Sequence, residues 1–254
     1  MLAGLLALAT TLGVVTTPIA PLRYKIEMKA TVEADLAAMG QGKMAGDIVM
    51  VAFVSVTMSD SAAGQLAHVV VDSMPVAPTG MMQQQGVDAS QGPAAKGAFF
   101  HLYVINGKVQ GTAKPSMDGN PSLTTLAQAV TVLFPGTLKS GLKAGDTYTD
   151  TATTNTTTEQ GTSNNVAITN WTVKGVDGDA LILEGSSTGK QSLDGPAAAS
   201  SGTSKGTRAM TSTLKGPVKS TTINNNTDMA VIPSGMSDPI PVKNIAEITI
   251  SQIN

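Results

Sequence analysis

The only two histidines of the chain, His68 and His101, are the first candidates for chemistry. Both lie in stretches that alternate like β-strands. Paired across neighbouring strands with Asp72 nearby, they could offer three ligands to a metal ion. Two histidines without a tight local spacing are a weak metal signal. We therefore expect two partly buried polar residues on a sheet and no metal site.

Carboxylates form a second candidate group, because Asp146, Asp150, Asp177 and Asp179 fall in or beside expected turns. The segment Asp177-Gly-Asp179 could begin a calcium loop, but the oxygen ligands of a complete site do not follow. A hairpin turn explains it better. A serine hydrolase is also disfavoured, since the chain has no Gly-x-Ser-x-Gly turn around a nucleophile. We expect no catalytic, metal-binding or cofactor-binding residues, and no enzyme.

Composition narrows the function further. Of 254 residues, 13% are charged and 41% hydrophobic, and the net charge is −2. Only three Tyr, four Phe and one Trp are present, which argues against nucleic acid as a partner. The absence of cysteine excludes disulfides, thiolate metal sites, covalently attached haem and a lipid-bearing cysteine anchor.

The first twenty residues carry no Asp, Glu, Lys or Arg and are mostly apolar. A helix of this length would span about 30 Å, close to the thickness of a hydrocarbon core. The segment also resembles a signal peptide, although a basic start is missing. We expect 1–20 to be an export signal or a membrane anchor, and 21–254 to form a single β-rich domain.

The elements that would position these residues are mainly strands. Strict alternation predicts a strand over 24–33, an apolar central strand over about 48–58, and further strands over 65–74 and 99–105. Asn106-Gly107 predicts a hairpin. One helix is expected at about 122–134, where Leu123, Leu126, Val130 and Leu133 share a face that must pack on the sheet. The fold class is mainly β: a large curved antiparallel sheet or half-barrel with this one central helix.

The second half repeats the pattern of a long polar strand followed by two apolar strands. Strands are expected over 147–158, 166–173, 180–184, 207–215, 218–227 and 244–253. The order suggests an internal pseudo-repeat between 24–74 and 146–188. Two segments read as long loops, 75–97 with its Pro, Gly and Gln residues, and the Gly/Ser/Ala-rich 189–206.

Four short motifs mark the stretch from Gly141 to Asn254: Leu142-Lys-Ala-Gly-Asp-Thr-Tyr148, Trp171-Thr-Val-Lys-Gly-Val-Asp-Gly178, Gly206-Thr-Arg-Ala-Met210 and Leu214-Lys-Gly-Pro-Val218. This layout resembles uncharacterised β-rich envelope proteins of bacteria and, more distantly, the half-barrel lipoprotein-carrier family. The resemblance implies an antiparallel sheet curled around a helix and an apolar hollow. It transfers no functional residue, and the lipid-anchoring cysteine of many such proteins is absent here.

These observations favour a non-enzymatic, membrane-extrinsic scaffold or accessory subunit in the periplasm. It would dock onto a larger membrane protein complex, for which a photosynthetic or respiratory complex would fit. The alternative is a periplasmic carrier or binding protein for a lipid or other apolar ligand. The space between sheet and helix discriminates the two, because an open apolar cavity above about 300 Å³ favours the carrier.

Overall fold

A computed structural model describes residues 20–61, 64–84, 88–110, 115–117, 119–136, 138, 140–158, 161–213 and 216–253. The expectation of an export signal or anchor over 1–20 therefore lies outside the described residues, apart from Ala20. No helix in these described ranges is long and apolar enough to cross a membrane.

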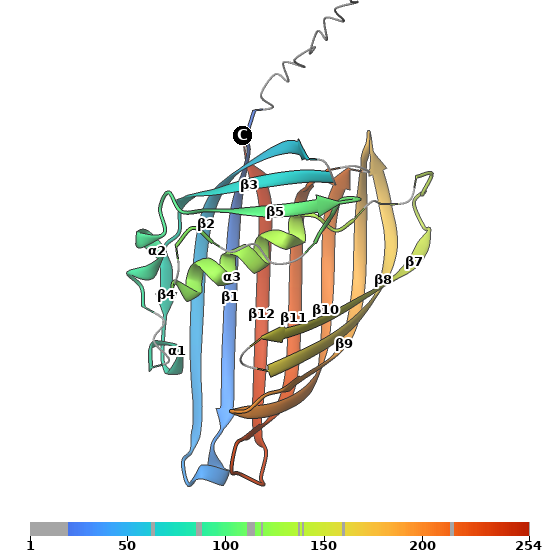
Figure 1. The fold of residues 1–254 in the computed structure, drawn as a ribbon. Helices are drawn as coiled ribbons and strands as arrows, with labels where there is room; N and C mark the ends of the chain where they lie inside the picture. Colours follow the sequence, from blue (N-terminus) through green and yellow to red (C-terminus); the bar gives the residue numbers. More distant parts are fainter. Residues whose placement is uncertain are drawn as a thin grey trace, which may run out of the picture.

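One large antiparallel sheet of 12 strands dominates the described part of the chain, which confirms the predicted fold class (Figure 1). Its strand order is β6-β5-β3-β2-β1-β12-β11-β10-β9-β8-β7, and β4 pairs with β2. The C-terminal strand β12 lies between β1 and β11, so the two halves of the chain join in one continuous sheet. The strands are β1 Leu22–Asp35, β2 Lys43–Ser61, β3 Gly64–Ser73, β4 Val76–Pro78, β5 Phe99–Ile105, β6 Lys108–Val109, β7 Thr147–Thr158, β8 Gly161–Asp177, β9 Ala180–Asp194, β10 Ala198–Thr213, β11 Val218–Pro233 and β12 Ile240–Ile253.

The predicted helix is present as α3 (Pro121–Val130), continued by a 3-10 turn η2 (Thr131–Leu133). Asn120 caps it, because its side-chain oxygen accepts a hydrogen bond from the backbone N–H of Leu123 at 3.0 Å. Pro121 occupies the first turn, where no backbone donor is needed. Figure 1 shows α3 lying across one face of the sheet. The other helices are the short α1 (Met81–Gln84), α2 (Gln91–Ala94) and the 3-10 turn η1 (Ala37–Met39).

The hydrophobic core lies between α3 and the sheet. Leu123, Leu126, Val130 and Leu133 are fully buried there, as the helical spacing predicted. They belong to one cluster with side chains from strands on both halves of the sheet, including Ile26, Val54, Phe100, Leu183 and Ile250. The space directly under the helix is therefore filled.

We call the face of the sheet that α3 covers the inner face, and the opposite face the outer face. Since side chains alternate along a strand, Trp171, Met210 and every second residue from them face inward. Further from α3, inner-face residues of β9 and β10 are half-buried, whereas their neighbours on the outer face are exposed. This difference is what a sheet that curves around its inner face produces.

The expected loop over 189–206 is wrong. Residues 189–194 continue β9 and residues 198–206 begin β10. Glycine and serine alternate here on the inner face, and the curved backbone leaves little room there. A Cβ on Gly206 would lie 2.5 Å from the backbone oxygen of Asn224, and a Cβ on Gly189 would lie 2.5 Å from Ser204 Oγ. The composition that suggested a loop is what a tightly curved pair of strands requires.

The segment 75–97 is also more structured than expected, because it contains β4, α1 and α2. It packs closely on the sheet: a Cβ on Gly46 of β2 would meet the backbone of Thr79 and of Met82 at 2.7 Å. Gly92 of α2 lies against the backbone oxygen of Met74. Removing this segment would therefore disturb the fold itself, and it is a poor candidate for a separable contact loop.

Candidate ligand-binding site

The candidate site is a cavity of about 490 Å³ on the inner face, beyond the C-terminal end of α3. Its walls come from the β5–β6 hairpin, from the segment that follows η2, and from β7, β8 and β10. The lining residues are Ile105, Asn106, Lys108, Gln110, Pro135, Gly136, Leu138, Tyr148, Thr149, Asp150, Trp171, Arg208 and Met210. The cavity size falls in the range of about 300–1,000 Å³ that is typical of small-molecule sites.

An aromatic pair forms one wall. Tyr148 of β7 and Trp171 of β8 are directly opposite each other in the strand register. Their rings stack with centroids 6.3 Å apart and planes inclined by 23°. The indole ring lies over Gly185 of β9, where a Cβ would come within 2.8 Å of it. Gly185 therefore lets the only tryptophan of the chain lie flat against the sheet beside the cavity.

Arg208 of β10 is the charged group of the site. It lies opposite Gly185 in the register, and its guanidinium carbon is 5.6 Å from the centre of the Trp171 ring. This is the geometry of a cation–π contact. Its Nη2 donates to the backbone oxygen of Val132 at 3.1 Å, and its Nε donates to Thr221 Oγ1 at 3.4 Å. The side chain thus bridges the end of α3 to the sheet.

Burial changes the acid–base properties of this wall. It lowers the pKa of Arg208 to about 10, against the opposing influence of Tyr148 and Asp150. The guanidinium still carries its proton at neutral pH. Burial also raises the pKa of Tyr148, with Asp150 adding to the effect and Arg208 opposing it. At neutral pH, this wall therefore presents one half-buried cation and one neutral phenol.

An apolar line extends from this wall across the inner face. The strand register places Tyr148, Trp171, Gly185 and Arg208 in one row. The row continues through Ile223, Ile248 and Met28, which are half-buried. It lies at the border between the part of the inner face that α3 covers and the part that it leaves open.

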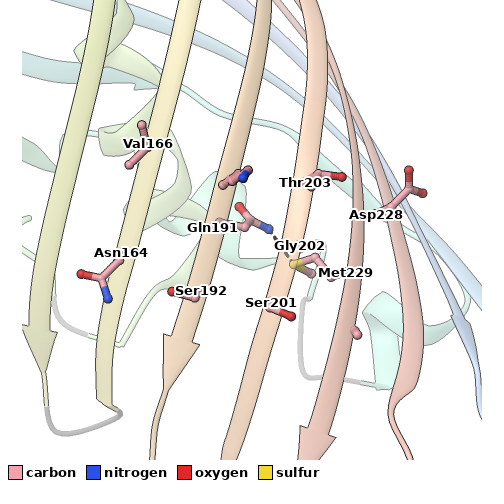
Figure 2. Close-up of a pocket in the computed structure, with 11 residues that line it drawn as sticks. Asn164, Val166, Gln191, Ser192, Ser201, Gly202, Thr203, Asp228 and Met229 are labelled. Atoms are coloured by element: carbon pink, nitrogen blue, oxygen red, sulfur yellow. Dashed lines mark hydrogen bonds between the residues drawn. The ribbon is translucent and has the colours of Figure 1, made fainter.

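The outer face carries a different feature, an open depression of about 690 Å³ (Figure 2). Two cross-strand rows of short or polar side chains supply most of its lining, Asn164-Ser192-Ser201-Ala230 and Val166-Lys190-Thr203-Asp228. Figure 2 also shows Gln191 extending past Gly202 to Met229, where its Nε2 lies 2.7 Å from the sulfur, although strand alternation assigns these three residues to the inner face. The depression offers no aromatic ring, so we rank it below the inner cavity.

The histidines singled out in the sequence form a pair away from this cavity. His68 on β3 and His101 on β5 are directly opposite each other, and His68 Nδ1 lies 2.9 Å from His101 Nε2. Asp72 does not join them: it accepts a hydrogen bond from Ser55 and lies 3.9 Å from Arg23 Nε. Among the described residues, no group of three or more His, Asp or Glu side chains could hold a metal ion.

The four aspartates also remain separate. Asp150 lines the cavity, and Asp146 accepts a hydrogen bond from the backbone N–H of Lys143 in the turn before β7. Asp177 and Asp179 flank the β8–β9 hairpin, as a turn predicts. The sequence analysis did not single out Trp171, Arg208 or Tyr148 as site residues. The available signal was Arg208, a charged residue at an inward-facing position two residues before the core residue Met210.

Comparison with known proteins gives little further guidance. No family model and no curated protein matches the chain. A structure of lipovitellin, described as showing lipid–protein interactions, is similar over 94% of this chain with 11% sequence identity and a TM-score of 0.48. This chain spans 25% of that chain's length. A likeness at this level carries no argument about this chain.

Proposed function

We propose that this chain is a non-enzymatic binding protein that holds a lipid or another apolar small molecule in the inner-face cavity. The observation that carries the proposal is the cavity of about 490 Å³ with Trp171 and Met210 in its wall, next to a core that is otherwise filled. The volume exceeds the threshold of about 300 Å³ in the carrier criterion, but the cavity lies beyond the end of α3, whereas the space between helix and sheet is filled. We therefore favour a carrier or binding protein over the membrane-extrinsic scaffold.

Trp171 makes the proposal directly testable, because it is the only tryptophan and lies in the cavity wall. A fatty acid brominated in mid-chain quenches a tryptophan that it contacts. We expect 9,10-dibromostearic acid or its methyl ester to quench Trp171 in a saturable manner at micromolar concentrations. The far-ultraviolet circular dichroism should stay unchanged. Quenching that rises linearly without saturation for both probes would contradict the proposal.

A matched variant assigns the quenching to the cavity. Replacing Leu138, a half-buried lining residue, with Phe would fill part of the space and should weaken binding of both probes. The same change at Ile182, which is 40% exposed on the outer face, should leave binding unchanged. Equal effects of the two variants would place the probe elsewhere on the protein.

The scaffold hypothesis remains a second proposal, together with a periplasmic, membrane-associated location. One observation favours a docking surface: Val166 and Ile168 are 40% and 41% exposed on the outer face of β8. A partner in a membrane protein complex would cover this apolar pair. Co-purification of a stoichiometric protein partner that is lost in a Val166→Ser, Ile168→Ser variant would support the hypothesis. Retention of that partner by the variant would contradict it.

A further inference from the structure

Arg208 is a half-buried cation that makes no ion pair with a described residue. Its two hydrogen bonds within the described part of the chain, to Val132 and Thr221, both go to neutral oxygens. Burying a charge without a counter-ion is costly, and proteins usually pair such groups. An arginine in this situation is suited to receive an anion from outside the chain.

The guanidinium also has donors to spare. It carries five N–H groups, and its hydrogen bonds to described residues, Val132 and Thr221, use two of them. The planar arrangement of the remaining donors matches the paired oxygens of a carboxylate or a phosphate.

The charged residues of the cavity wall, Arg208 included, carry a net charge of +1 among the described residues. Arg208 and Lys108 bring two positive charges to the cavity wall, whereas Asp150 brings one negative charge. Asp150 and Lys108 are exposed, so solvent screens them, and Arg208 dominates the interior of the cavity. The apolar part of a ligand would find Trp171 and Met210 next to the cation, and the line of Ile223, Ile248 and Met28 beyond it.

We propose that the ligand is an anionic amphiphile, whose carboxylate or phosphate pairs with Arg208 while its hydrocarbon chain fills the cavity. This inference rests on the proposed binding function and assigns the ligand class to it. Arg208 is then the residue that determines specificity for a charged headgroup. A fatty acid and a lysophosphatidate share the required chemistry.

A purely structural role for Arg208 is the competing explanation. Its bond to the Val132 carbonyl at the end of η2 stabilises the C-terminal end of the helix, where a cation is favourable. That role predicts that removing the charge would weaken all ligands equally, through a looser cavity. If Arg208 recognises the anion, removing its charge weakens binding of anionic ligands more than binding of neutral ones. The ratio of the two affinities therefore distinguishes the explanations.

The test compares three probes that carry the same brominated chain: 9,10-dibromostearic acid, its methyl ester, and the corresponding lysophosphatidate. Quenching of Trp171 gives the dissociation constants. In the native protein, at least one anionic probe should bind tenfold or more tightly than the neutral ester. Tighter binding of the brominated fatty acid would indicate a fatty acid as the ligand, and tighter binding of the lysophosphatidate would indicate a phospholipid. Equal affinity for all three probes would overturn the inference while leaving the binding function intact, and no binding of any probe would overturn both.

Variants then locate the selectivity. Arg208→Gln should weaken the preferred anionic probe about tenfold or more, the usual consequence of losing a hydrogen bond between charged groups. Binding of the methyl ester should change less than threefold. Lys205→Gln is the matched control, because Lys205 is exposed on the outer face of the same strand. Equal losses for acid and ester in Arg208→Gln would mean a structural role only.

Arg208→Lys covers the case in which the glutamine variant does not fold. It keeps the positive charge and loses the planar pair of donors. We expect it to retain a preference for the anionic probe over the ester, reduced from that of the native protein. An undiminished preference in Arg208→Lys would assign the selectivity to another residue.

Discussion

The hydroxyl of Tyr24 donates a hydrogen bond to the backbone oxygen of Val218, 3.1 Å away and 194 residues further along the chain. Tyr24 is on β1, Val218 begins β11, and β12 lies between these two strands. The ring is fully buried, and burial raises the pKa of the phenol well above its usual value. The bond therefore ties the N-terminal and C-terminal halves of the sheet together inside the core.

Replacing Tyr24 with Phe should lower the free energy of unfolding by about 1–3 kcal/mol, because a buried carbonyl loses its donor. Chemical denaturation measures the change. Tyr103→Phe is the control, since Tyr103 is 59% exposed and the same atom is removed there. If both variants lose the same stability, the buried bond contributes nothing specific.

Helix α3 should tolerate a charge only on its exposed face. Leu126→Asp would bury an unpaired carboxylate and should cost several kcal/mol of stability, whereas Thr125→Asp, one residue earlier and exposed, should cost less than about 1 kcal/mol. Thermal or denaturant unfolding distinguishes them. A soluble Leu126→Asp protein of native stability would show that this face is not core.

The curvature of β9 and β10 should depend on glycine at specific inner-face positions. Gly206→Ala places a Cβ 2.5 Å from the backbone oxygen of Asn224, so we expect a loss of roughly 1–3 kcal/mol. Gly175→Ala on β8 is the control, because its Cβ would lie 3.7 Å from Ile182 Cδ1, an ordinary contact. Equal stability of the two variants would argue that the strands can relax without glycine.

The histidine pair should make stability fall in mild acid. Burial, together with the charge of His101, lowers the pKa of His68 below its ordinary value of 6.5. As the pH drops through 6.5, the unfolded chain therefore binds a proton more readily than the folded protein does, and folding is disfavoured. The denaturation midpoint should decrease between pH 7.5 and 5.5, and His68→Gln should reduce that decrease. An identical pH dependence in the variant would rule out this source.

Elemental analysis of the purified protein tests whether His68 and His101 bind a metal ion. We expect no stoichiometric transition metal, because the described residues place no third His, Asp or Glu ligand beside the two imidazoles. A stoichiometric metal lost on His68→Ala or His101→Ala would contradict this prediction.

Much of the fold follows from local patterns in the sequence. Strict alternation located β1, the turn Asn106-Gly107 located the β5–β6 hairpin, and apolar spacing located α3 with the correct buried face. The β9–β10 region was missed because its glycine and serine content is also that of a loop. Whether such a segment forms a loop or a curved strand depends on how it packs against strands that are distant in the sequence. The internal repeat of 24–74 and 146–188 stays a prediction.

The candidate site was harder to predict, since its members are far apart in the chain. Tyr148, Trp171 and Arg208 become neighbours only through the register of β7, β8, β9 and β10. Val132 reaches Arg208 only because α3 packs across the sheet. Alternation along the strand could place the Arg208 side chain on the inner face. It could not show that Arg208 makes no ion pair with the described residues, because that requires the positions of the carboxylates around it.

Native mass spectrometry of the full chain, purified in mild detergent from the cells that produce it, tests the account most directly. The account predicts a protein that carries one small molecule, which denaturation releases and negative-ion detection identifies as an anionic amphiphile. Arg208→Gln should carry much less of it, and Lys205→Gln should carry the normal amount. A protein free of any small molecule, or bound only to another polypeptide, would contradict the account.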